Sequence, residues 1–473
     1  MKGLGTGGPG PHLPAHQVTT RNLGAAYPLV AEAGLGHRGV LVGNDLLGGS
    51  FVFDPFELYE QGIVSNPNMV VFGQIGRGKS AFVKSYLWRQ AVFGRCAWVV
   101  DPKGEYGALA RTWGVQPVAL RPGGPVRLNP LEPVPLPAIR ARAHGGAAAA
   151  AAVGAGGAGA GVAGANATGA DRRQGELLAS LAVACLGRDL LPRERVAIDL
   201  ALDTLARRGG VPTLPAVVDA LLGPEPDAAR SIRTDVATLL EDGRDVALEL
   251  RRMVHGDLRG MFDGPTTPGL DLSGPLVVLD LSALYGSPAL GILMTCATAW
   301  LQSALAARQL AARGAWEPPI PAADGGDRFP IGTGQVLVVV DEAWAILANL
   351  GIARWLQASW KLSRAHGVAN VAVLHRLSDL RAVGASGSEQ VGLAEGLLSD
   401  SEIRVVYAQS PGEVARSAEL LSLSPTEAEL LPQLRRGVAL WKVGNRSFLV
   451  QHLLGRSERA LVDTDAAMRR DTP

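Results

Sequence analysis

Cysteine is scarce in this sequence, and no two cysteines stand close together. Cys96, Cys185 and Cys296 are the only three in 473 residues, and the eight histidines form no HExxH motif and no cluster with a cysteine. A disulfide framework needs paired cysteines, and a structural zinc site needs clustered Cys and His ligands. The sequence therefore predicts neither feature, and it favours a reducing, cytoplasmic environment.

An excess of charge of either sign is also absent. The chain has 45 Lys and Arg against 44 Asp and Glu, a formal net charge of +1. No global basic field is available to hold DNA or an anionic membrane. Aromatic residues are 5% of the chain and are not interleaved with basic ones, so no stacking platform for single strands is evident. DNA remains a candidate partner that the charge does not support.

Long apolar runs are few. The uncharged segment from Ala289 to Ala307 has about the length of a membrane span, but Ala, Thr, Ser, Gly and Gln interrupt its Leu and Ile residues. This composition predicts a buried core helix. The first residues contain no apolar stretch of the kind that a secretory signal needs. We therefore expect a cytoplasmic protein.

Strand-like and helix-like patterns alternate along most of the chain. Apolar runs such as NMVVF, CAWVVD and VLVVV are followed by helical patterns, which predicts an α/β fold with a parallel sheet buried on both faces. Ala143 to Ala170 is almost wholly Ala and Gly, which is typical of a flexible loop. The predicted organisation is a β-rich lead-in (1–66), a first part of the core (67–130), a Pro-rich then Ala/Gly-rich insertion (131–173), an all-helical inserted subdomain (174–265), a second part of the core (266–455) and a C-terminal tail (456–473).

The most specific motif is GQIGRGKS, from Gly73 to Ser80. It matches G-x-x-x-x-G-K-[ST] and lies between an apolar strand pattern and a helical one. Glycines let such a loop turn tightly and aim its N–H groups at phosphates. Lys79 is expected to reach the β- and γ-phosphates, and Ser80 to bind Mg²⁺. The predicted cofactors are ATP and Mg²⁺, and the predicted nucleotide-binding residues are Gly73, Gln74, Ile75, Gly76, Arg77, Gly78, Lys79, Ser80 and Ala81.

Two adjacent acids, Asp341 and Glu342, directly follow the apolar run VLVVV. Taken alone, such a pair is equally well read as a turn at the end of a strand. With a phosphate-binding loop upstream, Asp341 is expected to help hold Mg²⁺, and Glu342 to act as the general base that polarises the attacking water.

Several motifs, taken in order, resemble a known family. They are GQIGRGKS, DPKGEY at Asp101–Tyr106, VVVDEAW ending at Trp344, and SRAHG followed by a strand. This order resembles the HerA/FtsK superfamily of P-loop motor ATPases, and within it the TraC class of conjugative-transfer, type IV secretion ATPases. The resemblance implies a RecA-like P-loop NTPase core with a mostly parallel sheet, interrupted by an all-helical subdomain.

The resemblance also implies roles for three further residues. Glu105 corresponds to an acid beside the nucleotide, although a surface turn is the alternative. His375 stands where family members usually have a Gln that senses the γ-phosphate, and it reads equally as a core histidine at a strand end. Arg364 corresponds to an arginine finger that reaches a neighbouring subunit's nucleotide; its alternative is a solvated arginine at a helix end.

The implied function is ATP hydrolysis that powers conjugative or type IV secretion transfer. The implied assembly is a homo-oligomeric ring, a hexamer, that works with membrane-associated channel components at the inner face of the cell membrane. Two alternatives stay open. One is a DNA translocase of the HerA/FtsK or coupling-protein type. The other is an assembly scaffold that binds ATP with little turnover, which is suggested by His375 in the place of Gln.

Overall fold

A computed structural model of the 473-residue chain describes residues 34–132, 160–270, 274–287, 289–314, 335–347, 367–375 and 400–462, with isolated positions at 353, 354, 356, 357, 360, 392 and 396. For 160–171 and 306–314 it describes the backbone alone. Four predicted regions lie partly outside these residues: the lead-in (1–33), the insertion (133–159), the second part of the core (271–273, 288, 315–334, most of 348–366 and most of 376–399) and the tail (463–473). Arg364 also lies outside them.

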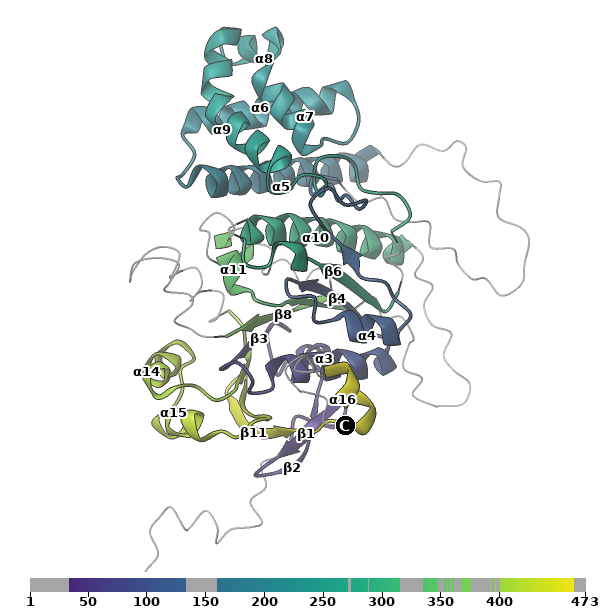
Figure 1. Ribbon diagram of the computed structural model, residues 1–473, viewed down its shortest axis with the longest axis vertical. Coiled ribbons are helices and arrows are strands. Elements are labelled where there is room, and N and C mark those ends of the chain that lie inside the picture. The colour runs from purple at the N-terminus through teal and green to yellow at the C-terminus, as the bar shows by residue number, and fades with distance from the viewer. Residues whose placement is uncertain are drawn as a thin grey trace, which may run out of the picture.

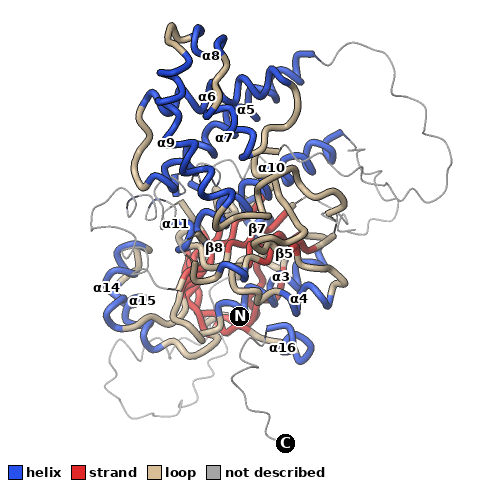
Figure 2. The backbone as a smooth tube through the Cα atoms, turned by 45° about the horizontal axis from the view of Figure 1, so that its top comes forward, coloured by secondary structure: helices blue, strands red, loops and turns tan. Residues whose placement is uncertain are grey.

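One mixed sheet of eleven strands runs through the molecule (Figure 2). Its order is β2-β1-β11-β10-β9-β3-β8-β7-β4-β6-β5. Seven neighbouring strands are parallel: β9 (Ile403–Val406), β3 (Met69–Phe72), β8 (Val368–Leu374), β7 (Val336–Val340), β4 (Cys96–Asp101), β6 (Leu276–Asp280) and β5 (Val118–Ala119). Four are antiparallel: β2 (Gly49–Phe53), β1 (Val40–Asp45), β11 (Arg446–His452) and β10 (Val438–Val443).

Helices cover both faces of the parallel part, as its continuous apolar strands require. On one face lie α3 (Lys79–Gln90), α4 (Gly107–Thr112) and α16 (Arg456–Val462), and on the other lie α10 (Leu290–Gly314) and α11 (Trp344–Leu347) (Figure 1). Alternate residues of β3 show the division: Val71 packs in the core with α3 and α4, whereas Val70 packs in the core with α10. The smaller elements are α2 (Pro55–Glu60), η1 (Ala91–Phe93), η2 (Ser282–Leu284), α14 (Pro411–Leu420), α15 (Pro425–Leu430) and η5 (Leu431–Gln433).

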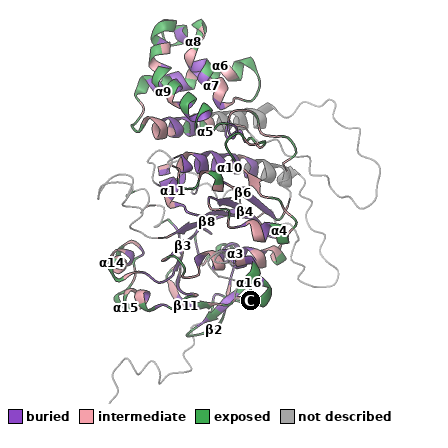
Figure 3. Ribbon diagram, in the orientation of Figure 1, coloured by how far each residue is buried: buried purple, intermediate pink, exposed green. Residues whose placement is uncertain are grey.

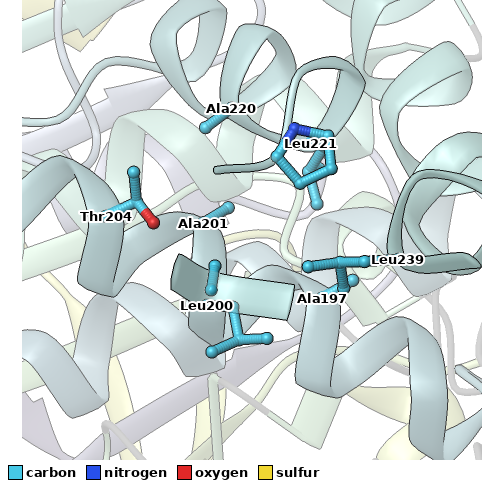
Figure 4. Close-up of a pocket in the computed structure, with 9 residues that line it drawn as sticks. Ala197, Leu200, Ala201, Thr204, Ala220, Leu221 and Leu239 are labelled. Atoms are coloured by element: carbon cyan, nitrogen blue, oxygen red, sulfur yellow. The ribbon is translucent and has the colours of Figure 1, made fainter. Parts of the chain in front are cut away.

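Five helices form a subdomain that lies on the far side of α10 from the sheet (Figure 1). They are α5 (Ala160–Leu186), α6 (Pro192–Arg208), α7 (Leu214–Leu222), α8 (Pro226–Ser231) and α9 (Val236–His255). Their inward faces are buried and their outer faces are exposed (Figure 3). Inside, Ala197, Leu221 and Leu239 line a small apolar cavity between α6, α7 and α9 (Figure 4).

One helix crosses a sequence-based segment boundary, and the N-terminal strands join the main sheet. Helix α5 begins at Ala160, inside the segment predicted to be a loop, because the helix continues into the subdomain and its C-terminal half packs there. The described part of the lead-in, residues 34–66, contains β1 and β2, and β1 pairs with β11 in the main sheet. Gly444 and Asn445 form the turn between β10 and β11, with Val443 paired to Arg446.

The segment from Ala289 to Ala307 belongs to α10, and its described side chains include Leu293, Cys296 and Trp300, all fully buried. Burial against the sheet and the helical subdomain explains its apolar composition. Within the described parts of the chain, no helix combines the length and the apolar character needed to cross a membrane.

Candidate nucleotide-binding and catalytic site

The GQIGRGKS motif forms a loop between β3, which ends at Phe72, and α3, which begins at Lys79. Gly73, Gly76 and Gly78 have φ of 148°, 75° and 113°, a region that other residues rarely adopt. Gly73 has a second requirement, because a Cβ placed there would lie 2.4 Å from the Cβ of Tyr407. The loop therefore has its shape because glycine occupies these positions.

The C-terminal part of the chain holds this loop from outside the motif. The Gln74 N–H donates to the Ala408 carbonyl at 3.1 Å, and the Gly437 N–H donates to the Arg77 carbonyl at 2.9 Å. The Tyr407 N–H donates to the carbonyl of the last residue of β3 at 2.8 Å. Backbone bonds thus fix both ends of the loop to segments more than three hundred residues away.

Lys79 is buried, with 3% of its surface exposed. Its ammonium group donates to the carbonyls of Gly73, at 2.5 Å, and Gln74, at 2.9 Å. The N-terminus of α3 has no side-chain cap, and Ser80 is half-buried in its first turn. Arg77 donates to the Gln74 side chain, and Ile75 is exposed at the tip. Among the described residues, no side chain caps the N–H groups of the first helical turn, which are suited to an anion.

Strand register brings the other predicted residues to the same edge of the sheet. Phe72 pairs with Leu374 of β8, and Ala372 of β8 pairs with Val340 of β7, which in turn pairs with Val100 of β4. The strands are parallel, so their carboxyl ends coincide. The residues that follow these ends, Gly73, His375, Asp341 with Glu342, and the DPKGEY segment, therefore gather along one edge.

Asp341 is the more deeply desolvated of the two acids. It is 4% exposed, and burial raises the pKa of this carboxyl to about 6, with the charges of Glu342, Asp101 and Glu105 adding to the rise. Desolvation and like charges both penalise the ionised form. A cation at this position would relieve that penalty, which fits a carboxylate that serves Mg²⁺.

Glu342 lies in a close arrangement of donors. It has φ of 52° and is 2% exposed. Its Oε1 accepts from Nε2 of His375 at 2.5 Å and forms an ion pair with Lys103, and its Oε2 accepts from Nε1 of Trp344 at 2.5 Å. Burial alone would raise the pKa of Glu342, but the bonds and charges of His375 and Lys103 outweigh it and lower the pKa to about 2. Glu342 is thus held as a carboxylate.

The DPKGEY segment is built around Asp101. Its carboxylate accepts from the N–H groups of Lys103, Glu105 and Tyr106 at 3.2, 3.1 and 2.9 Å. Glu105 then pairs with Lys84 of α3 at 3.2 Å. The Lys84 side chain is fully buried, whereas 24% of the Glu105 side chain is exposed. Glu105 therefore lies against the helix that begins at the phosphate-binding loop.

Sequence patterns did not indicate three of these contacts. Lys84 is one of several polar residues on α3, Trp344 reads as an ordinary core aromatic, and nothing in DPKGEY marks Lys103 as a partner of Glu342. Lys103 and Glu342 are far apart along the chain, so no local signal links them. Of the predicted catalytic residues, the structure brings Glu342, His375 and Glu105 to this edge, and Arg364 lies outside the described residues.

The chain has the fold of known P-loop NTPases. VirB4 of Thermoanaerobacter pseudethanolicus superposes with a TM-score of 0.63 and 18% identity, over 90% of this chain and 100% of that one. The conjugative coupling protein TrwB superposes with a TM-score of 0.52 and 15% identity, over 92% of each chain in an unbound form and 93% of each in a complex with ADPNP. No protein-family model and no curated protein sequence matches the chain. At these identities, the likeness establishes the α/β RecA-like P-loop fold.

Proposed function

We propose that this protein hydrolyses ATP to power transfer through a type IV secretion or conjugation system, as an oligomeric motor. The observation that carries the proposal is the glycine-built loop ahead of α3, at the same sheet edge as Asp341 and Glu342. The fold likeness to VirB4 and to TrwB supports the assignment to this class of motor. TrwB structures that contain ADPNP, or ADP with Mg²⁺, support the choice of nucleotide and metal.

The loop fits the phosphates of a nucleotide. Its glycine conformations let the backbone turn tightly ahead of α3, and the α3 dipole adds partial positive charge at the helix N-terminus. The Lys79 ammonium, already in the loop, exchanges the carbonyls of Gly73 and Gln74 for phosphate oxygens.

Ser80 and Asp341 are the residues that would hold Mg²⁺. Mg²⁺ is commonly held by one or two carboxylates together with substrate phosphates and water, so a cage of protein ligands is not required. Among the described residues, no group of three or more His, Cys, Asp or Glu side chains forms such a cage. When bound, the metal would neutralise charge that develops on the phosphates.

Glu342 is the proposed general base. In hydrolysis the water oxygen forms a bond to the γ-phosphorus, the bond from that phosphorus to the bridging oxygen breaks, and ADP leaves. The water proton passes to the Glu342 carboxylate. Glu105 is proposed to lie beside the bound nucleotide, where its ion pair with Lys84 of α3 holds it. His375 lies against Glu342, so its proposed sensing of phosphate acts through that carboxylate.

Arg364 is proposed to complete the site of a neighbouring subunit. Arginine fingers that act in this way contribute roughly 10³–10⁵ in rate, so the active form would be a homo-oligomeric ring, with a hexamer as the proposed size. Membrane-associated channel components at the inner face of the cell membrane are the proposed partners of that ring. The TrwB likeness favours a second candidate, a DNA translocase of coupling-protein type.

Steady-state ATPase rate against protein concentration, with and without DNA, tests these proposals. The rate per chain should rise steeply with concentration as rings form, and a Lys79→Ala variant should be inactive. Stimulation by DNA with a steep salt dependence favours the translocase. ATP binding without turnover above the Lys79→Ala background, at any concentration, contradicts the motor and leaves an ATP-dependent scaffold.

A further inference from the structure

Glu342 has more partners than a general base needs. Lys103 and His375 both contact Oε1, and Trp344 contacts Oε2. A carboxylate has about four lone-pair positions, two on each oxygen, so Oε1 is filled and Oε2 is half filled. We call Lys103, His375 and Trp344 together the Glu342 clamp. A water that gives its proton to Oε1 has to displace one member of the clamp.

Lys103 is the member of the clamp that is best placed to move. Its side chain is 24% exposed, against 16% for His375 and 2% for Glu342. Its ammonium lies 5.7 Å from the ring of Tyr285, which is 50% exposed. Lys103 therefore has an outward path along a surface aromatic ring, whereas His375 directly follows a fully buried strand and Trp344 begins α11.

The backbone conformation of Glu342 is one that contacts of the clamp help to maintain. Glu342 has φ of 52°, one of three positive values among the described residues other than glycine. Such conformations are strained and persist where surrounding contacts impose them. Bonds to both carboxylate oxygens are contacts of this kind. If one partner leaves Oε1, the side chain is free to turn toward another donor.

We propose that Lys103 is a positioning residue that holds Oε1 of Glu342 idle, and that it must leave before this oxygen accepts a proton from water. This inference rests on the proposed ATPase function. The negative charge that draws Lys103 away is that of a bound nucleotide's phosphates, since both groups lie at the same edge of the sheet.

The first test is a set of variants assayed for ATP turnover. Lys103→Met keeps the length of the side chain and removes its charge. We expect its kcat to rise about tenfold, because proton transfer to Oε1 no longer waits for Lys103 to leave. Lys103→Arg should restore the low basal rate. The matched control is Lys442→Met, which breaks the ion pair between Lys442 of β10 and Glu427 of α15. This change should leave the basal rate unchanged.

The second test does not depend on turnover. The indole N–H of Trp344 donates to Glu342, so its NMR signal in ¹⁵N-tryptophan-labelled protein reports the clamp directly. A Trp344→Phe variant identifies that signal among those of the nine tryptophans. We expect Lys103→Met to shift the signal, and AMP-PNP with Mg²⁺ to shift the wild-type signal in the same direction.

The results separate failure of this inference from failure of the proposed function. A fall in kcat for Lys103→Met, or a Trp344 signal that neither Lys103→Met nor AMP-PNP moves, overturns the inference even in an active ATPase. If the wild type binds AMP-PNP and never turns over ATP, the proposed function fails. The Trp344 signal then still decides whether Lys103 holds Glu342.

Discussion

Replacement of Gly73 by alanine tests how the phosphate-binding loop is built. The φ of 148° is costly for any residue with a Cβ, by about 1–3 kcal/mol. The new Cβ would also lie 2.4 Å from the Cβ of Tyr407. Tyr407 is 1% exposed, and its backbone N–H donates a hydrogen bond to the Phe72 carbonyl, so it has little room to move. An overpacked contact of this kind adds about 1–3 kcal/mol. The expected loss in free energy of unfolding is therefore about 2–6 kcal/mol.

Gly76→Ala is the matched control in the same loop. Its φ of 75° carries strain of about 1–2 kcal/mol, but no atom lies within 4 Å of the added Cβ. Gly73→Ala should therefore lose at least about 1 kcal/mol more than Gly76→Ala, since it alone adds the overpacked contact.

The assay is urea unfolding followed by tryptophan fluorescence, with midpoints compared between variants because a chain of this size does not have to unfold in two states. Binding of a fluorescent ATP analogue to the folded variants shows whether the loop still holds phosphate. Gly73→Ala should bind far more weakly than Gly76→Ala. Equal midpoints and equal affinities for the two variants would refute the argument that Tyr407 sets the shape of the loop.

Three other predictions concern assembly, pH and the C-terminal helix. Mixing Arg364→Ala with Lys79→Ala chains should restore part of the ATPase activity that each lacks alone, because a mixed ring has sites with both residues; absence of any recovery argues against action in trans. Burial lowers the pKa of His452 to about 4, with the charge of Arg89 adding to the effect, so the unfolded chain binds more protons between that pH and about 6.5. Stability should therefore decline as pH falls through this window, and His452→Gln should flatten the dependence in urea unfolding at several pH values. Arg89 donates two hydrogen bonds of 2.6 Å to the Glu458 carboxylate of α16. Arg89→Ala should therefore lower the free energy of unfolding by about 2–3 kcal/mol and make α16 more susceptible to proteolysis. Unchanged cleavage would show that α16 is held by its apolar contacts.

Short-range features of this protein follow from the sequence. The phosphate-binding loop is one continuous run of eight residues, and its glycines, lysine and serine are each required by local backbone geometry or by phosphate chemistry. The parallel strands are continuous apolar runs because both of their faces are covered. The turn at Gly444–Asn445 is likewise decided by the residues that form it. Each of these depends on neighbours in the chain, so a pattern is enough to predict it.

Boundaries between segments are harder to predict, because the deciding partner lies elsewhere. Helix α5 begins at Ala160, within an Ala/Gly-rich stretch whose glycines disfavour helix. Packing of the C-terminal half of α5 against α6 and α9 stabilises the helix, and local helix propensity does not include this contribution. In the same way, β1 joins the sheet through β11, more than four hundred residues later.

The sequence by itself determined that this chain has a phosphate-binding loop, a pair of acids after a buried strand and an α/β core, since residues that are neighbours in the sequence specify each of these features. The tertiary structure alone decided the contacts of those groups. It set Lys103 and His375 on Glu342, Lys84 on Glu105 and Tyr407 against Gly73, because parallel strands from distant parts of the chain end at one edge. The identity of a catalytic residue is local information, whereas its position and protonation depend on neighbours that the fold supplies.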